Sequence, residues 1–155
     1  MDMETFAQNV EKLRPKHYRT AFCYFGDETA ALDVLEEAVY RGLCACKKLR
    51  QQEYFSTWMT RILINECHRE QKRRRRFRSF EELPEPTAEE LDCLPLQDAL
   101  LRLPKDLKDV IILRYFSCYT LAETAEALQI PQGTVVTRQR RALKLLRLEL
   151  EEVGL

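Results

Sequence analysis

Hydrophobic residues recur at steps of three and four along most of the chain, which is the spacing of one face of an α-helix. The clearest example is an apolar stripe through Leu32, Leu35, Val39, Leu43 and Cys46. No run alternates between apolar and polar residues for long enough to be a convincing strand. The pattern therefore predicts an all-α fold.

Proline, glycine and capping residues predict where the helices begin and end. In the first half, Pro15 and the Gly26-Asp27 pair separate three helical segments, and Asp27 suits the N-cap of the segment that follows. A further helix is expected from about Tyr54 to Arg76. In the second half, the expected helices are 95–103, 104–116, 120–128 and 131 to about 151.

An acidic stretch with three prolines divides the chain. Residues 79–97 contain Pro84, Pro86 and Pro95 and no basic residue, a composition that resists packing. We therefore predict two small helical domains, residues 1–78 and 98–155, joined by a flexible acidic linker over 79–97. The net charge of zero hides this division. Residues 1–78 carry 16 basic and 11 acidic side chains, and the negative charge of the acidic stretch offsets this positive excess.

The cysteines and histidines give no pattern of a metal site. Cys44 and Cys46 are the only close pair among six cysteines, and neither His17 nor His68 lies near them in sequence. We expect reduced thiols and no metal or cofactor. The chain has no apolar stretch of membrane-spanning length and its first residues are acidic, so we expect a cytoplasmic protein without membrane insertion.

The last 36 residues have the order of a helix-turn-helix. A short helix opens with the capping-box pattern of Thr120 and Glu123, and a turn of about three residues leads to a longer basic helix. At 100° per residue, one side of that helix carries Val135, Gln139, Ala142 and Leu146 and is expected to face the core. The other side is either a solvated basic face or a surface that contacts DNA, and the capped helix before it favours DNA.

This region also resembles a known family. Residues 103–106, 110–116 and 130–138 are similar to region four of extracytoplasmic-function (ECF) RNA polymerase sigma factors. The resemblance implies that this domain reads the minus-thirty-five promoter element. The residues expected to do so are Thr134, Val136, Thr137, Arg138, Arg140, Arg141 and Lys144. Val136 replaces a commonly basic residue and Gln139 an apolar one, so we expect an altered base preference and a slightly weakened core.

Residues 30–76 are similar to region two of the same family. Asp33, Glu36 and Glu37 match the acidic motif that the family uses to bind core RNA polymerase, with Glu36 in place of the usual glutamine. Their spacing places them on the helix face away from Leu32 and Leu35. An ordinary solvated acidic face is the alternative interpretation.

Residues 55–65 resemble the helix that opens and reads the minus-ten element. Asn65 stands at the family's base-reading position, and its amide offers both a donor and an acceptor to the Watson–Crick edge of a flipped base. Residues 49–54 would form the rest of the pocket, and Trp58 is expected to pack in the core. The other residues expected to contact this DNA are basic: Arg61, Arg69, Lys72, Arg73, Arg74, Arg75 and Arg76.

The sequence thus predicts a sigma factor that binds core RNA polymerase and promoter DNA. A stand-alone helix-turn-helix regulator is the alternative, although the N-terminal segment resembles neither a sensor nor a dimerisation domain. Catalysis is not expected, because the acidic residues lie mostly in the linker and the two histidines form no dyad. The resemblance also implies an anti-sigma factor as a partner.

Overall fold

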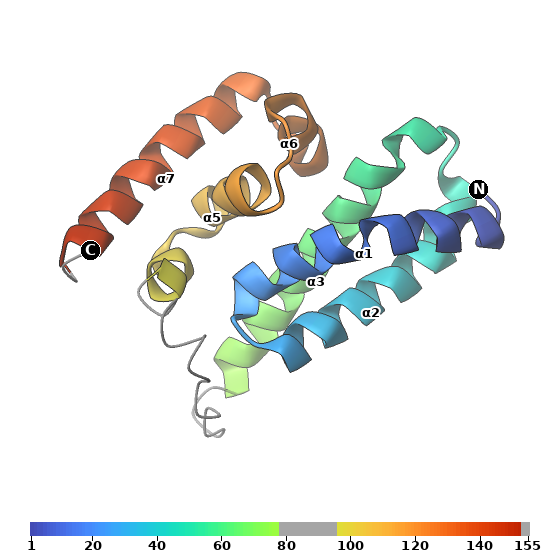
Figure 1. Cartoon of the computed structure of the whole chain (residues 1–155), viewed down its shortest axis with the longest axis horizontal. Coiled ribbons are helices and arrows are strands. Elements are labelled where there is room, and N and C mark those ends of the chain that lie inside the picture. Colours follow the sequence, from blue (N-terminus) through green and yellow to red (C-terminus); the bar gives the residue numbers. More distant parts are fainter. Residues whose placement is uncertain (78–95, 153–155) are drawn as a thin grey trace.

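The computed structural model describes residues 1–77 and 96–152, with side chains described to residue 147. Within these ranges all regular secondary structure is helical, so the prediction of an all-α fold is confirmed. Helices α1, α2 and α3 form an N-terminal unit, and residues 96–152 form a C-terminal unit beside it (Figure 1). The predicted linker, residues 79–97, falls almost wholly outside the described residues. Its last two residues, 96 and 97, belong to helix 96–102.

Helix α1 (Met3–Phe25) continues through Pro15, where we predicted a break. Its first turn is capped by the Asp2 side chain, which accepts from the Thr5 amide at 2.7 Å, and it ends at Gly26 with φ +64°. Proline removes one helical hydrogen bond, but its fixed φ is compatible with a helix. Because Phe6 before Pro15 and Tyr24 after it are both buried in one core, packing on both sides holds the helix together.

Helix α2 (Glu28–Ala45) begins at the predicted cap, since the Asp27 carboxylate accepts from the amides of Thr29 and Ala30. Four members of the predicted stripe face the core, since Leu35 and Cys46 are buried and Val39 and Leu43 pack against the core. Leu32 is exposed, and the buried residues of the helix are Ala30, Ala31, Val34, Leu35, Ala38 and Gly42. At Gly42 the helix crosses α3 closely, because a Cβ there would lie 2.8 Å from the Met59 sulfur.

Two short 3₁₀ turns, η1 (Cys46–Lys48) and η2 (Gln52–Tyr54), connect α2 to α3 (Phe55–Phe77). Phe55 is buried at the start of α3, with its ring edge-on to that of Phe6 at 5.7 Å. Trp58 is partly buried and packs against the same core, as predicted.

The C-terminal unit contains helix 96–102, α5 (Lys105–Ile111), a π-helical stretch η3 (Ile112–Phe116), α6 (Leu121–Leu128) and α7 (Gln132–Glu152). The two units pack against each other, which the sequence did not predict. Ile112 is fully buried in the core of the N-terminal unit, and Ile64 of α3 packs against Leu113 and Tyr119. In the described part of the chain no helix has the length and apolar character needed to cross a bilayer.

Candidate nucleic-acid interface

The three acidic residues expected to bind polymerase all lie on the solvent side of α2. Asp33, Glu36 and Glu37 are exposed, whereas residues 34–35 between them are buried. Glu37 also accepts a hydrogen bond from Arg41 one turn later, at 3.1 Å. Helix α2 therefore presents these carboxylates on a face whose reverse side is anchored in the core.

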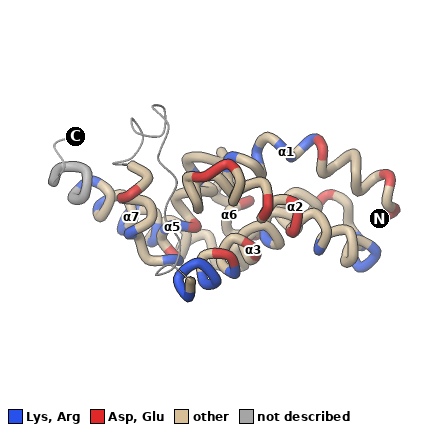
Figure 2. The backbone as a smooth tube through the Cα atoms, turned by 90° about the horizontal axis from the view of Figure 1, so that it is seen from below, with Lys and Arg blue, Asp and Glu red and all other residues tan. Residues whose placement is uncertain are grey.

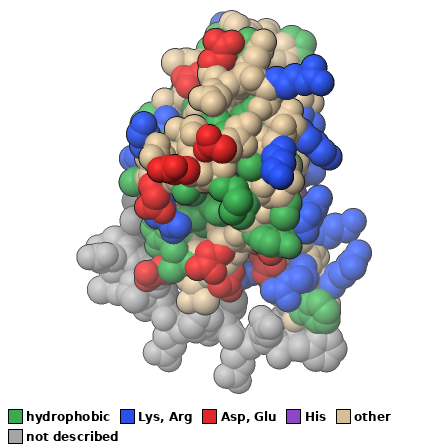
Figure 3. All heavy atoms as spheres, turned by 90° about the vertical axis from the view of Figure 1, so that its right-hand side faces the viewer, with side chains coloured by type: hydrophobic (Ala, Val, Ile, Leu, Met, Phe, Trp, Pro, Cys, Tyr) green, Lys and Arg blue, Asp and Glu red, His purple; other side chains and the backbone are tan. Residues whose placement is uncertain are grey.

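Two apolar side chains extend this acidic face, and the sequence analysis did not assign them to it. Leu32 is 36% exposed and Tyr40 is 63% exposed. Leu32, Glu36 and Tyr40 follow one another at steps of four, so they lie along one side of α2. The spacing of four could have identified this row from the sequence, but the sequence analysis assigned Leu32 to the core. On the face shown in Figure 3, hydrophobic and acidic side chains lie together, with Lys and Arg side chains gathered at the edge.

On α3, the proposed base reader and two arginines form an exposed row. Arg61, Asn65 and Arg69 are separated by four residues and all are exposed, so they occupy successive turns of one face. The Asn65 amide makes no hydrogen bond with any residue that the structure describes. Its donor and acceptor are therefore available to a ligand in this structure.

Arg69 has a protein partner that the sequence analysis did not foresee. The Glu66 carboxylate, only 7% exposed, lies 2.7 Å from Arg69 and 2.6 Å from Arg41 of α2. Glu66 thus joins α2 to α3 and fixes two guanidinium groups beside the row that contains Asn65. The link between α2 and α3 cannot be read from sequence spacing, because Arg41 and Glu66 are brought together only by the helix crossing.

The loop expected to complete the minus-ten pocket lies at the start of α3. Gln51 and Tyr54 are exposed there and Leu49 is partly buried. Asn65 stands ten residues beyond Phe55, about 15 Å along the helix axis. A pocket that includes both Asn65 and the start of α3 would therefore have to extend along almost three turns of the helix.

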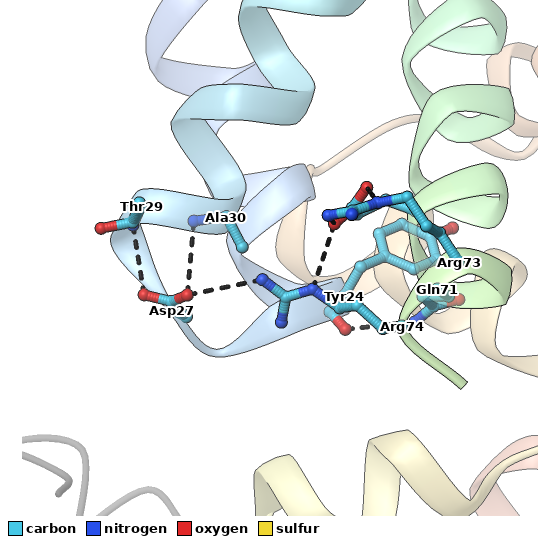
Figure 4. A network of polar contacts seen from close by, with 8 residues as sticks. Tyr24, Asp27, Thr29, Ala30, Gln71, Arg73 and Arg74 are labelled. Atoms are coloured by element: carbon cyan, nitrogen blue, oxygen red, sulfur yellow. Dashed lines mark hydrogen bonds and ion pairs between the residues drawn. The ribbon is translucent and has the colours of Figure 1, made fainter. Parts of the chain in front are cut away.

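The basic run at the end of α3 is divided between internal ion pairs and solvent. Arg73 and Arg74 both bind the Glu70 carboxylate, and the hydrogen bond from Arg73 lowers the pKa of Glu70. Arg74 also lies 3.6 Å from Asp27, the N-cap of α2 (Figure 4). Its guanidinium carbon lies over the Phe25 ring, 5.1 Å from the ring centre. Arg74 therefore fastens the end of α3 to the α1–α2 corner.

The remaining members of the run face solvent. Lys72, Arg75 and Arg76 are exposed and make no ion pair with a described carboxylate. In Figure 2 the end of α3 is a dense group of basic residues. Three positive side chains held on one helix end suit a DNA backbone, which carries a regular line of phosphates.

The helix-turn-helix has the predicted elements. The capping box is formed: Thr120 accepts from the Glu123 amide at 3.1 Å, and the Glu123 carboxylate accepts from the Thr120 amide at 3.0 Å. Helix α6 ends at Gln129, which adopts a left-handed conformation with φ +55°, and residues 129–131 make the turn to α7. The turn therefore has the three residues expected.

Helix α7 turns its apolar side inward and its basic side outward, as predicted. Val135, Ala142 and Leu146 are buried. Of the arc expected to contact DNA, the exposed members are Thr137, Arg140, Arg141 and Lys144, and the partly buried members are Thr134, Val136 and Arg138. A hollow of about 650 Å³ beside the first turn of α7 is lined in part by Thr134, Arg138 and Arg141.

Gln139, expected to weaken the core slightly, has polar partners. Its side-chain oxygen accepts from Arg114 Nε at 3.1 Å, and its nitrogen donates to the Tyr115 hydroxyl at 3.1 Å. Arg114 also donates to the carbonyl of Tyr119 at 2.8 Å. The glutamine therefore ties η3 to α7 through hydrogen bonds, so no buried polar group is left without a partner at this position.

The cysteines of the described residues are free thiols in two settings. Cys23, Cys46 and Cys67 are buried, and burial raises the pKa of Cys23 to about 12. Cys44 and Cys118 are exposed. Across residues 1–77 and 96–152 no group of three or more His, Cys, Asp or Glu side chains is placed to hold a metal ion.

Each of the two units matches a known protein family. Residues 10–77 match the family described as Sigma-70 region 2, and residues 93–146 match the family described as Sigma-70, region 4. The first range covers α2 and α3 with its basic end, and the second covers α6 and α7 as far as residue 146.

Characterised relatives align over most of the chain. RNA polymerase sigma factor SigV of Bacillus subtilis is 32% identical, with 89% of this chain and 86% of the relative covered. ECF RNA polymerase sigma factor SigW of the same organism is 28% identical, with 98% and 92% covered. This chain belongs to the RNA polymerase sigma factors, and within them to the extracytoplasmic-function type. It directs promoter recognition in transcription initiation, and sigma factors are non-catalytic regulators of RNA polymerase.

Solved structures show the same fold across both units. CnrH in complex with the cytosolic domain of CnrY gives a TM-score of 0.78 at 21% identity, covering 97% of this chain and 90% of that one. RpoE in complex with the anti-sigma factor NepR from Bartonella quintana gives 0.76 at 21% identity, covering 96% and 98%.

Proposed function

We propose that three separate surfaces of this sigma factor divide the work of promoter recognition. The acidic face of α2, formed by Asp33, Glu36 and Glu37 with Leu32 and Tyr40 beside it, binds core RNA polymerase. Exposed carboxylates next to exposed apolar side chains suit a protein partner, because apolar area provides affinity and charge provides orientation.

The exposed row of α3 contacts the minus-ten element. Asn65 reads a base, Arg61 and Arg69 lie on the turns either side of it, and Lys72, Arg75 and Arg76 neutralise the adjoining backbone. Since about 15 Å of helix separates Asn65 from the loop at 49–54, these two sites contact different nucleotides of the opened strand.

The outer arc of α7 reads the minus-thirty-five element in the major groove. The observation that carries this assignment is the formed capping box, three-residue turn and exposed arginine arc within a domain that matches region 4. In this arrangement the domain of residues 1–78 serves the polymerase and the minus-ten element, and the domain of residues 98–155 serves the minus-thirty-five element.

We further propose that the chain acts in the cytoplasm, performs no catalysis of its own and is restrained by an anti-sigma factor. The support for a restraining partner is the shared fold with RpoE, whose structure was solved with the anti-sigma factor NepR.

Run-off transcription with bacterial core polymerase tests the function directly. A pool of promoter fragments from the bacterium that encodes this chain should give discrete transcripts only when the chain is added. Glu36→Lys should reduce their yield by weakening polymerase binding, and Glu11→Lys, the same charge reversal on the exposed side of α1, should not. Tight binding of the free chain to palindromic DNA, with no transcripts, would favour a stand-alone regulator instead.

A further inference from the structure

Two helices meet at one buried carboxylate beside the row proposed to contact the minus-ten element. The Glu66 side chain on α3 is only 7% exposed, and its Oε1 atom lies 2.6 Å from Nε of Arg41 on α2 and 2.7 Å from Nη1 of Arg69 on α3. Helices α2 and α3 pack side by side (Figure 1). Because both arginines contact the same oxygen atom, their guanidinium groups are held next to each other.

The contacts with Glu66 leave most of the hydrogen-bond donors of both arginines available. A guanidinium carries five N–H donors in a planar fork. Arg41 uses Nε for Glu66 and for a hydrogen bond to Glu37 at 3.1 Å, so its two Nη groups have no partner among the described residues. Arg69 uses Nη1 for Glu66, and its Nε and Nη2 atoms have no partner there either. These side chains are 47% and 59% exposed, so a ligand in solvent can reach the remaining donors.

Adjacent guanidinium groups with available donors suit an anion that has several oxygen atoms. Phosphate is such an anion, and arginine binds it through pairs of parallel hydrogen bonds. Two arginines so close together would repel each other, and the negative charge of Glu66 between them offsets that repulsion. Since Glu66 is buried beneath both guanidinium groups, a phosphate in solvent meets the positive groups first.

The arginine pair lies one helical turn from the proposed base reader. Asn65 and Arg69 are four residues apart, about 6 Å along the axis of α3, and both are exposed. A strand whose base reaches Asn65 therefore brings a neighbouring phosphate close to Arg69. Arg41 comes from α2, so the pair exists only because the two helices cross at Glu66.

We propose that Arg41 and Arg69 form a phosphate clamp on the opened minus-ten strand, and that Glu66 is the positioning residue that holds the clamp together. This inference rests on the proposed function, because it assigns a phosphate site next to the base reader. Glu66 fixes two long side chains before DNA arrives, so less side-chain freedom is lost on binding. Arg41 thereby adds α2 to the surface that contacts DNA.

Glu66→Gln tests the positioning role, because the charge and the position of Glu66 predict opposite results. Glutamine keeps the side-chain size and one acceptor oxygen but removes the negative charge. Loss of a negative charge near DNA by itself tightens binding. Loss of the ordered clamp should instead weaken binding of the holoenzyme to a promoter fragment with a pre-opened minus-ten region, by about three- to tenfold. Binding as tight as that of wild type, or tighter, would overturn the role of Glu66.

Glu70→Gln is the matched control for this charge change. Glu70 also lies on α3 and also binds two arginines, Arg73 and Arg74, but both belong to its own helix. This variant should bind the pre-opened fragment as tightly as wild type or more tightly. Urea unfolding measures the stability of each variant separately. A less stable Glu66→Gln protein with undiminished affinity for DNA would show that Glu66 only joins the two helices.

Neutral phosphate analogues test the clamp itself. A methylphosphonate, placed at one position of the pre-opened strand at a time, removes the charge of a single phosphate. At one position next to the base read by Asn65, this replacement should weaken wild-type binding by about tenfold. In Arg41→Gln the same replacement should have much less effect, because the clamp has lost one member. Equal losses in the two proteins at every position would overturn the clamp.

The Arg41 variants also separate charge from geometry. Arg41→Gln should make the slope of log affinity against log salt concentration shallower by about 0.7, the value for one contact with single-stranded DNA. Arg41→Lys keeps the charge but not the planar fork, so it should restore the slope without restoring the full affinity. Full affinity in Arg41→Lys would contradict a clamp that depends on the guanidinium. If Glu66→Gln does not fold, the variants of the half-exposed Arg41 decide the proposal.

The proposed function and the clamp fail in different ways. A wild-type holoenzyme that is insensitive to every methylphosphonate, and whose promoter binding is unchanged by Asn65→Ala, would overturn the minus-ten role of α3 and the clamp with it. Sensitivity to Asn65→Ala, with no phosphate position that depends on Arg41, would overturn the clamp alone.

Discussion

The guanidinium of Arg74 lies 3.6 Å from the carboxylate of Asp27, the residue that caps the first turn of α2. Arg74 comes from the basic run at the far end of α3, so one side chain of that run holds the α1–α2 corner in place. Its neighbours Arg75 and Arg76 are exposed and make no ion pair with a described residue. Adjacent arginines in one run therefore have different roles.

This difference predicts two separable phenotypes. Arg74→Gln should lower the free energy of unfolding by about 1 kcal/mol, because it removes partly exposed ion pairs and the cation–π contact with Phe25. It should leave the salt dependence of promoter binding almost unchanged. Urea unfolding followed by fluorescence of the single tryptophan, Trp58, measures the first effect.

Arg75→Gln with Arg76→Gln should give the opposite result. Each phosphate contact adds about 0.7 to 0.9 to the slope of log affinity against log salt concentration, so the loss of two contacts should make the slope for the holoenzyme shallower by about 1.4 to 1.8. Stability should change little, since both side chains are exposed. An unchanged slope would mean that this end of α3 faces solvent or protein in the complex.

Asn65→Ala should impair promoter opening without unfolding the protein. The Asn65 amide is exposed and has no partner among the described residues, so its removal costs no internal hydrogen bond. Permanganate footprinting of the minus-ten region should show reduced reactivity, and preference within the element should weaken. Asn9→Ala on α1 is the control. If opening survives and the variant unfolds instead, Asn65 is a structural residue.

Arg140→Ala or Arg141→Ala should relax base preference at one or two positions of the minus-thirty-five element. A bidentate contact from arginine to guanine discriminates by about 1 to 3 kcal/mol, and both side chains are exposed on the outer arc of α7. Selection from a randomised library measures the preference, with Arg19→Ala on α1 as the charge control. A uniform loss of affinity across all sequences would show that these residues contact phosphates only.

His17 should make the protein less stable in mild acid. It is buried beside Thr60, and burial lowers its pKa from 6.5 to about 4. The unfolded chain therefore takes up a proton near pH 6.5 and the folded chain only near pH 4, so this contribution is intact above pH 6.5 and is lost as the pH falls toward 4.

Between pH 7.5 and pH 5 the loss from His17 should be about 2 kcal/mol of unfolding free energy. His17→Gln keeps a hydrogen-bonding side chain near Thr60 and does not titrate. Its unfolding free energy should therefore fall less over the same range, as measured by urea unfolding at both pH values. Equal losses of unfolding free energy in wild type and variant would mean that folding does not lower the pKa of His17.

The sequence by itself determined the features that depend on neighbouring residues. The caps at Asp27 and Thr120, the three-residue turn before α7 and the inward side of α7 were all predicted correctly. Each depends on residues a few positions apart on one helix or turn, where hydrogen-bonding reach and the helical repeat fix the geometry. The same repeat predicted the exposure of Asp33, Glu36 and Glu37 on α2, although Leu32 lies on their side and not on the core side.

Only the tertiary structure decided which apolar residues are buried and which polar groups meet. Helix α1 passes through Pro15 because a core holds both of its halves. Leu32 faces solvent because the core-facing positions of α2 around it are occupied by Ala31, Val34 and Leu35. The contacts of Tyr24 with Asp109 and of Thr20 with Ser117 join residues 85 and 97 positions apart. No periodicity encodes such pairs, because they arise when two folded surfaces come together, and burial then makes each hydrogen bond costly to leave unmade.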